Sequence, residues 1–470
     1  MNVLFKIYIN TKRIISSNRL LMFISFFVFV LLYYLLLYKK YFLTEEFMYD
    51  LETYNQIVWR IVHGLSPFST VFGKLNSDSH FEPILYLVAI PYALFQRPLF
   101  LLLIQLFFTG IAGIGLYLIS LTLFNSKASA LLVQNIFYYH RLTLAYLMDA
   151  FHPEVIAVCF FILSYYFYLN KRKALFLVTV LLALFCKESV VFLIFPYGIY
   201  LYFKDRRNPL GRWALLCSVF SIFYFLLAMK IITKMSILET NTFFNADSEV
   251  NAYGWLGSSP YEVMRNIISK LKLLIGKDLA SKYLTYGIRV LDSFLYLPVF
   301  NTFILVALPT FLINTLSSRP IMQTMDFHYQ TLLVPILFLS ILLFFAKISK
   351  SDQSRKQSNV FFLYLFLVFF VNFIFFAKAF RYYVNSNGIS PLEMKQIDKI
   401  IGNNSKILTT PKLSYFFSGR RYIYYKKPED HLIDYIIVSK TDSLDTDNLS
   451  LVYQGDKLLL YKNYSINFDD

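Results

Sequence analysis

Long apolar runs separated by short polar segments fill most of the chain. Residues 20 to 38 form an uncharged run of 19 residues. At about 1.5 Å of rise per residue, such a run covers the roughly 30 Å hydrocarbon core of a bilayer. Comparable runs recur as far as residue 380, and about 11 to 12 apolar helices are expected. The pattern predicts an all-α polytopic membrane domain over residues 1–380.

Lysine and arginine near the ends of these runs predict how the chain is oriented. Four basic residues precede the first run, whereas acidic residues follow Lys39 and Lys40 after it. The N-terminus is therefore expected in the cytoplasm. Basic clusters at 171–173, 204–212 and 347–356 predict further cytoplasmic loops. This scheme places the C-terminal region on the extracytoplasmic side. The membrane itself is expected to be a bacterial inner or plasma membrane.

Two apolar segments do not fit a simple crossing pattern. Residues 81–95 and 99–122 both look like spans, but the scheme permits only an odd number of crossings between residue 80 and Lys127. The shorter segment, 81–95, is therefore predicted to be a partial or re-entrant helix. Residues 174–203 lie between two cytoplasmic clusters and must form a hairpin, and its arms are short for full spans. Its tip, at Lys187 and Glu188, is expected in a recessed polar pocket.

Two amphipathic segments are predicted to lie on the outer membrane surface. In residues 51–62, apolar residues recur at helical spacing, with Glu52, Asn55, Gln56 and Arg60 on the opposite side. This helix would occupy the first outer loop, at about 50–63. The second segment, at about 260–275, begins with a capping pattern of Ser259, Pro260 and Glu262.

The composition changes after residue 380 to that of a small water-exposed unit. A capped helix is expected from Ser390 to Gly402, followed by strands at 406–410, 421–426 and 434–439 and a hairpin around Gly455. Residues 381–470 are thus predicted to form an extracytoplasmic α/β cap domain. The segment has neither a phosphate-cradling glycine motif nor a nucleophile elbow, which favours a passive cap.

Composition supports the membrane assignment and excludes other classes. The chain is 57% hydrophobic and only 16% charged, which is too apolar for one soluble domain. Its net charge of +16 comes mainly from short loops between apolar runs, so orientation and anionic lipid headgroups explain it without nucleic acid. The three cysteines lie inside apolar stretches and predict buried, unreactive thiols.

Ten ionisable residues border the apolar runs, and the orientation scheme places all of them at the outer face. Charges at membrane depth are costly, so their convergence indicates a functional site. The ten residues are Asp50, Glu52, His80, Glu82, Asp149, His152, Glu154, Lys187, Glu188 and His328.

Each of these residues also has a structural explanation. Asp50 could only cap the helix that follows it. Lys187 and Glu188 could form a simple ion pair at a hairpin tip. A further set lies around Pro83 and Pro153. These residues could serve simply as helix-start residues, or they could form a polar cluster that holds a divalent metal. They are His80, Glu82, Asp149, His152 and Glu154.

Several motifs resemble the membrane protein family known as domain of unknown function 2079. They are DLETYNQIVWRIVHGLSPFST (50–70), SHFEPILYLVAIPYALF (79–95), DAFHPEVIA (149–157), CKES (186–189) and HYQTLLVPILF (328–338). The family is considered similar in architecture to the GT-C glycosyltransferases, which take a sugar from a polyprenyl-phosphate carrier at the outer face. Such enzymes have an essential acidic residue before an interfacial helix of the first outer loop, the place of Asp50. This chain lacks a clear Asp-x-Asp pair there, and Asp50-Leu51-Glu52 is the nearest equivalent.

The resemblance implies an inverting glycosyltransferase that uses a polyprenyl-phosphate-linked sugar donor. Glycosyl transfer needs a carboxylate for the acceptor and a cation or metal for the departing phosphate. Asp50 or Glu52 would supply the carboxylate, while Lys187, Glu188 and His328 would bind the carrier. The alternative is a transporter or flippase of a lipid-linked or anionic solute. Transporters usually show internal repeats and midplane binding groups, whereas the charges here lie at the outer ends of helices.

Overall fold

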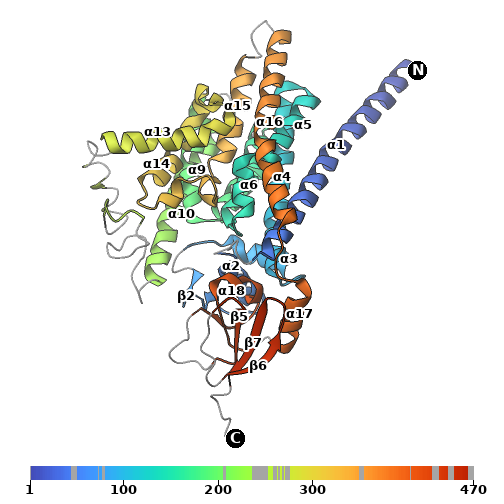
Figure 1. Ribbon diagram of the computed structural model, residues 1–470. Coiled ribbons are helices and arrows are strands. Elements are labelled where there is room, and N and C mark those ends of the chain that lie inside the picture. The colour runs from blue at the N-terminus through green and yellow to red at the C-terminus, as the bar shows by residue number, and fades with distance from the viewer. Residues whose placement is uncertain are drawn as a thin grey trace.

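Four helices of the computed structural model are long and apolar enough to cross a membrane. The crossing segments belong to α1 (Asn2–Tyr41), α4 (Pro98–Phe124), α10 (Gly211–Met235) and α16 (Ser354–Asn385). The protein is an integral membrane protein (Figure 1). The structure describes residues 2–43, 50–71, 73–76, 80–204, 208–235, 252–257, 262, 265, 266, 269, 276–348, 354–402, 404–425, 433–442 and 449–463.

Shorter helices complete the bundle. They are α5 (Lys127–Tyr139), α6 (Arg141–Met148), α7 (Pro153–Leu169), α8 (Lys173–Leu184), α9 (Val191–Lys204), α13 (Lys277–Leu291), α14 (Leu308–Leu316) and α15 (Val334–Ile348). Among the described residues, four helices are full candidate spans and four shorter ones are also apolar, so not every predicted apolar helix is long enough to cross a membrane. Helices of 12 to 17 residues, such as α7 and α8, reach only about 18 to 25 Å.

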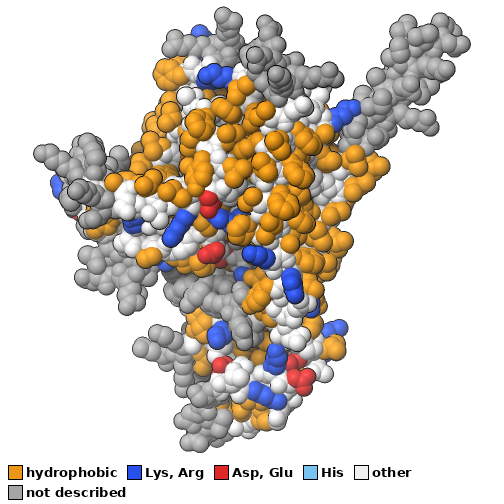
Figure 2. All heavy atoms as spheres, turned by 45° about the horizontal axis from the view of Figure 1, so that its top comes forward, with side chains coloured by type: hydrophobic (Ala, Val, Ile, Leu, Met, Phe, Trp, Pro, Cys, Tyr) orange, Lys and Arg blue, Asp and Glu red, His pale blue; other side chains and the backbone are white. Residues whose placement is uncertain are grey.

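Apolar side chains cover the outside of the bundle. Phe27 on α1, Phe223 on α10 and Phe370 on α16 are all exposed. Figure 2 shows hydrophobic side chains over much of one face of the bundle, with scattered charged side chains that become more frequent in the lower part of the view. Exposed apolar surface of this extent is typical of contact with lipid.

Close helix packing positions the bundle interior. The ring of Phe29 on α1 stacks on Tyr138 of α5 with centroids 4.1 Å apart. Gly198 allows α9 to approach α10, because a Cβ atom there would lie 2.1 Å from the carbonyl oxygen of Ala214. These contacts fix how closely α1 packs on α5 and α9 packs on α10.

Two irregular segments match the sequence predictions. α3 (Ile84–Tyr92) has nine residues and contains Pro91, so the apolar segment at 81–95 forms a short helix, as predicted. The hairpin at 174–203 is also confirmed: α8 and α9 are its arms, and the one-turn helix η2 (Glu188–Val190) is its tip. Further one-turn helices connect α13 to α15, namely η4 (Asp292–Phe294), η5 (Leu297–Phe300), η6 (Thr302–Ala307), η7 (Pro320–Gln323) and η8 (His328–Gln330).

The helix predicted over residues 51–62 is confirmed as α2 (Leu51–Val62). It is buried on both sides, and its polar residues lie against the C-terminal segment rather than water. A two-stranded antiparallel sheet that the sequence did not predict follows it, formed by β1 (Phe68–Ser69) and β2 (Lys74–Leu75). The second amphipathic segment, with Ser259 and Pro260, lies outside the described residues except for helical positions 262, 265, 266 and 269.

A small mixed sheet forms the C-terminal part of the chain, which we call the C-terminal module (residues 389–463). Its strands are β3 (Ile407–Thr409), β4 (Ile423–Tyr424), β5 (Tyr435–Ser439), β6 (Leu449–Gln454) and β7 (Leu458–Asn463), in the order β4-β3-β5-β7-β6. β3 is parallel to β4 and β5, whereas β7 is antiparallel to β5 and β6. The predicted helix is α17 (Pro391–Ile400), capped by the Ser390 side chain. The sequence analysis missed α18 (Pro411–Phe417), a helix of only seven residues.

Candidate functional site

Nine of the ten singled-out ionisable residues lie at one end of the bundle, next to α2. They come from the start of α2, the segment before α3, the α6–α7 turn, η2 and η8. Figure 1 shows this end facing the C-terminal module. Contacts link six of them in two groups. We call these the Asp149 group (Asp149, His152 and His328) and the Lys187 group (Lys187, Glu82 and Glu154). The sequence separation of these elements is large, so the convergence is a property of the fold.

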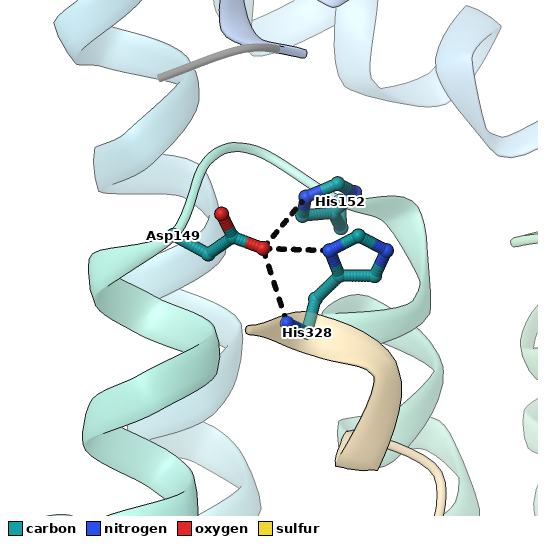
Figure 3. A group of neighbouring side chains, drawn as sticks. All are labelled: Asp149, His152 and His328. Carbon is teal, nitrogen blue, oxygen red and sulfur yellow. Dashed lines mark hydrogen bonds and ion pairs between the residues drawn. The ribbon is translucent and has the colours of Figure 1, made fainter. Parts of the chain in front are cut away.

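The Asp149 group consists of Asp149, His152 and His328 (Figure 3). The Oδ2 atom of Asp149 lies 2.6 Å from Nδ1 of His328 and accepts a hydrogen bond of 3.0 Å from the His328 backbone N–H. The same oxygen lies 3.4 Å from Nε2 of His152. The two imidazole rings stack with centroids 3.5 Å apart. One carboxylate oxygen therefore organises both histidines.

Gln105 on α4 holds the turn that carries His152. Its Oε1 atom accepts a hydrogen bond of 2.8 Å from the His152 backbone N–H, and its Nε2 donates to the carbonyl oxygen of Ala150 at 3.0 Å. The side chain is fully buried. Sequence analysis did not single it out, although a lone glutamine inside the apolar run 99–122 is a signal of an internal polar partner.

The charges of the Asp149 group are set by burial and by mutual contacts. Burial raises the pKa of Asp149, but hydrogen bonds from His152 and His328 outweigh it and hold that pKa well below its usual value. Burial lowers the pKa of His152, yet Asp149 more than compensates, so the His152 pKa is raised. Burial and the neighbouring His152 lower the pKa of His328. The Asp149 carboxylate is therefore ionised, and protonation is more favourable at His152 than at His328.

Asp50 occupies the N-cap position of α2 but does not cap the helix. The Asp50 carboxylate accepts no hydrogen bond from a backbone N–H of the first turn. Its carboxylate is 45% exposed and lies with Oδ2 3.8 Å from Nε2 of His152. The capping explanation for this residue therefore has no support. Asp50 is the accessible carboxylate of the site.

The Lys187 group lies deeper. The Lys187 Nζ atom donates a hydrogen bond of 2.6 Å to Oε1 of Glu154 and lies 3.9 Å from Oε1 of Glu82. Glu82 also accepts a hydrogen bond of 2.8 Å from the Tyr54 hydroxyl. The ammonium group is only 7% exposed. Lys187 thus neutralises buried carboxylates, a use of its charge that competes with the predicted binding of a carrier phosphate.

Glu188 and His80 tie the hairpin tip to the segment before α3. Nδ1 of His80 lies 3.0 Å from Oε1 of Glu188, whose other oxygen accepts a hydrogen bond of 2.9 Å from the Phe81 backbone N–H. Burial raises the pKa of Glu188, but the contacts with His80 and Lys187 outweigh burial. The net pKa is lowered, so the carboxylate is ionised. These contacts make Glu188 a connector between two loops of the site.

Glu52 is the residue that the structure places apart from the other nine. Its carboxylate is fully buried and accepts a hydrogen bond from the Tyr425 hydroxyl of the C-terminal module. Burial raises the pKa of Glu52 well above its ordinary value. A protonated, buried Glu52 suits a bridge between α2 and the module. It does not suit the predicted role of a base for an acceptor.

The Asp149 group has the donors of a divalent metal site. Two imidazoles and one carboxylate are ligands that zinc and similar ions take. Two ligand atoms of one tetrahedral zinc ion lie about 3.4 Å apart. The distance from Asp149 Oδ2 to His152 Nε2 is also 3.4 Å. The Asp149–His328 hydrogen bond of 2.6 Å would have to lengthen when an ion enters. Asp50 stands beside His152 as a further oxygen donor.

The family described as "Predicted membrane protein (DUF2079)" matches residues 40–465. The chain belongs to the DUF2079 family. The matched range includes all ten ionisable residues and runs from the end of α1 to the C-terminal module, so the DUF2079 match covers both parts of the site. Among curated proteins, none was found to match this chain.

Proposed function

We propose that the protein is an inverting glycosyltransferase of GT-C type that takes its sugar from a polyprenyl-phosphate carrier at the outer face of the membrane. The observation that carries the proposal is Asp50, a half-exposed carboxylate that does not cap its helix and lies 3.8 Å from a buried imidazole. An accessible carboxylate beside the helix that follows the first apolar run is what the GT-C resemblance requires.

The chemistry assigns Asp50 to the acceptor. The acceptor oxygen or nitrogen attacks the anomeric carbon of the sugar and gives its proton to the Asp50 carboxylate. The bond from the anomeric carbon to the phosphate oxygen breaks, and its electron pair leaves with polyprenyl phosphate. Attack from the face opposite the phosphate inverts the anomeric carbon.

In this proposal the Asp149 group stabilises the departing phosphate. Asp149 raises the pKa of His152 and so favours its protonated form, which would carry positive charge next to Asp50. A divalent ion held by the Asp149 group would supply the same charge in place of that proton. The Lys187 group acts one step further away, since Lys187 and Glu154 fix the start of α7, which carries His152.

Release of polyprenyl phosphate tests this function. The purified full-length protein in nanodiscs is incubated with a panel of radiolabelled polyprenyl-phosphate sugars and cell-envelope acceptors. Wild type should release polyprenyl phosphate, and Asp50→Asn should release it at least about 100-fold more slowly because the base is lost. Asn also keeps the size of the side chain, and the capping role is absent, so the thermal stability of the variant should be unchanged.

Asp456→Asn is the matched control, because Asp456 is exposed at the turn between β6 and β7, in the C-terminal module. Equal release by wild type and Asp50→Asn would contradict the proposal. Movement of the labelled carrier across the membrane without release of polyprenyl phosphate would instead favour the transporter or flippase.

A further inference from the structure

A cavity of about 460 Å³ lies outside the candidate functional site, where the bundle meets the C-terminal module. Figure 1 shows α3, α17 and α18 at this junction. The cavity is lined by the end of α3, the start of α4 and residues of α17 and α18. Its charged lining residues are Arg97, Lys395, Asp398, Lys399 and Arg420. Four cations against one carboxylate leave an excess of positive charge.

The protein satisfies the Arg420 guanidinium only in part, although its Nε donates a hydrogen bond of 2.6 Å to the carbonyl oxygen of Phe417. The side chain is 4% exposed, and its Nη2 lies 3.2 Å from Oδ1 of Asp398. Asp398 is shared, because its Oδ2 lies 2.5 Å from Nη1 of Arg97. The buried Nη1 atom of Arg420 has no hydrogen-bond partner among the described residues. A buried guanidinium with an idle donor is costly unless an acceptor reaches it.

The surroundings of the cavity are those of a membrane surface. Arg97 and Pro98 begin α4, one of the four candidate spans, so the cavity lies at the boundary of the hydrocarbon region. Trp59, Phe416 and Phe417 also line it. Aromatic rings and basic side chains together are typical of the headgroup level of a bilayer.

Exposed apolar side chains continue from the cavity toward the bundle. Leu94 lines the cavity and is 74% exposed, and Phe95 and Ile90 on the same segment are also exposed. An anion with a hydrocarbon tail can therefore place its charge near Arg420 and its tail along the α3 segment. A free phosphate would use only the charged half of this surface.

We propose that this cavity binds the phosphate headgroup of an anionic membrane phospholipid, whose acyl chains lie along the exposed side of α3. The lipid would join the C-terminal module to the bundle through one ligand. The proposal does not depend on glycosyl transfer, since no residue of the Asp149 or Lys187 group lines the cavity.

Lipid binding by the purified full-length protein tests the inference. Phosphatidylglycerol is titrated in detergent and followed by native mass spectrometry, with phosphatidylcholine and inorganic phosphate as the other probes. Lys395→Gln/Lys399→Gln removes two exposed cations from α17 without touching the Arg420 contacts. Each lysine near a lipid surface contributes about a fivefold effect, so the pair should weaken phosphatidylglycerol binding roughly 25-fold.

The matched control is Lys412→Gln/Lys440→Gln, which removes the same charge from exposed positions of the module that do not line the cavity. This pair should bind phosphatidylglycerol like wild type. Equal weakening in both double variants would overturn the proposal, because it would reduce binding to net charge. Unchanged binding in Lys395→Gln/Lys399→Gln, or full competition by inorganic phosphate or phosphatidylcholine, would also overturn it.

Discussion

At the scale of single residues, the carboxylates of the candidate site differ in exposure and in the partners that they contact. Asp50 is accessible, Asp149 holds two histidines, Glu154 and Glu82 share one lysine, and Glu52 is withdrawn into a bridge. The sequence shows all of these as acidic residues at the ends of apolar runs. Burial and hydrogen-bond partners give them different protonation states and therefore different uses.

Lys187 is expected to act mainly through stability. Lys187→Met leaves Glu154 and Glu82 buried without their cation, which should destabilise the protein by about 3 to 5 kcal/mol. Thermal unfolding in detergent measures this loss. Lys187→Met/Glu154→Gln removes charge from both partners and should recover part of it. Wild-type stability in the single variant would show that the ammonium contributes nothing to the fold and would restore the carrier-binding role.

His152 should make stability depend on pH. Its folded pKa lies above the ordinary value, so its protonated form stabilises the fold below about pH 6.5 and this contribution is lost as the pH rises through the raised value. In buffer with chelator, the melting-temperature difference between wild type and His152→Gln should therefore be larger at about pH 6 than at about pH 9. A difference that grows with pH would mean that His152 is neutral in the fold.

At the scale of elements, sequence patterns predicted extended features better than local ones. The runs that became α4, α7, α8 and α9 were identified because their apolar character persists over many residues. α18 and the β1–β2 pair were missed because elements of seven and two residues carry almost no periodic signal. The polar residues of α2 were recognised, but their partners, such as Ser418 for Asn55, lie more than 350 residues away.

Gly198 is expected to control how closely α9 and α10 pack. Gly198→Ala would place a methyl group 2.1 Å from a backbone oxygen of α10, and the required shift should cost about 1 to 3 kcal/mol. Gly287→Ala in α13 is the control, because its Cβ would make ordinary contact with Phe311 at 3.7 Å and alanine favours the helix by about 0.5 to 1 kcal/mol. Equal melting temperatures for both variants would show that α9 and α10 can move apart freely.

At the scale of the whole molecule, the sequence predicted the convergence of distant charges but not their pairing. The distribution of basic residues in the loops predicted that the ten residues lie at one face of the membrane. In the structure, nine of them lie at one end of the bundle. Which carboxylate meets which cation depends on loop conformations that no local pattern encodes. The departure of Glu52 follows from the docking of the C-terminal module, which hydropathy cannot detect.

The orientation itself remains a prediction, with the C-terminal module outside. The basic residues Lys347, Lys350, Arg355 and Lys356 precede the spanning part of α16, which begins at Asn359, and should keep this connection in the cytoplasm. A phosphatase reporter fused after residue 470 should be active, and a fluorescent reporter that matures only in the cytoplasm should be dark. The same reporters placed after Lys350 should give the opposite result. A bright cytoplasmic reporter at residue 470 would reverse the assignment of the two faces.

The attachment of the C-terminal module to the first part of the chain also bears on how the protein is made. Ile389 donates a hydrogen bond of 2.8 Å to the carbonyl oxygen of Phe42, and Tyr415 donates one of 3.0 Å to that of Tyr41. Because a ribosome delivers the module last, the amides of Asn55 and Gln56 wait through most of translation for partners in it. A chain that ends before the module lacks the Ser418 and Arg420 acceptors, so its Asn55 and Gln56 side chains keep only their contacts to Tyr92 and Thr70.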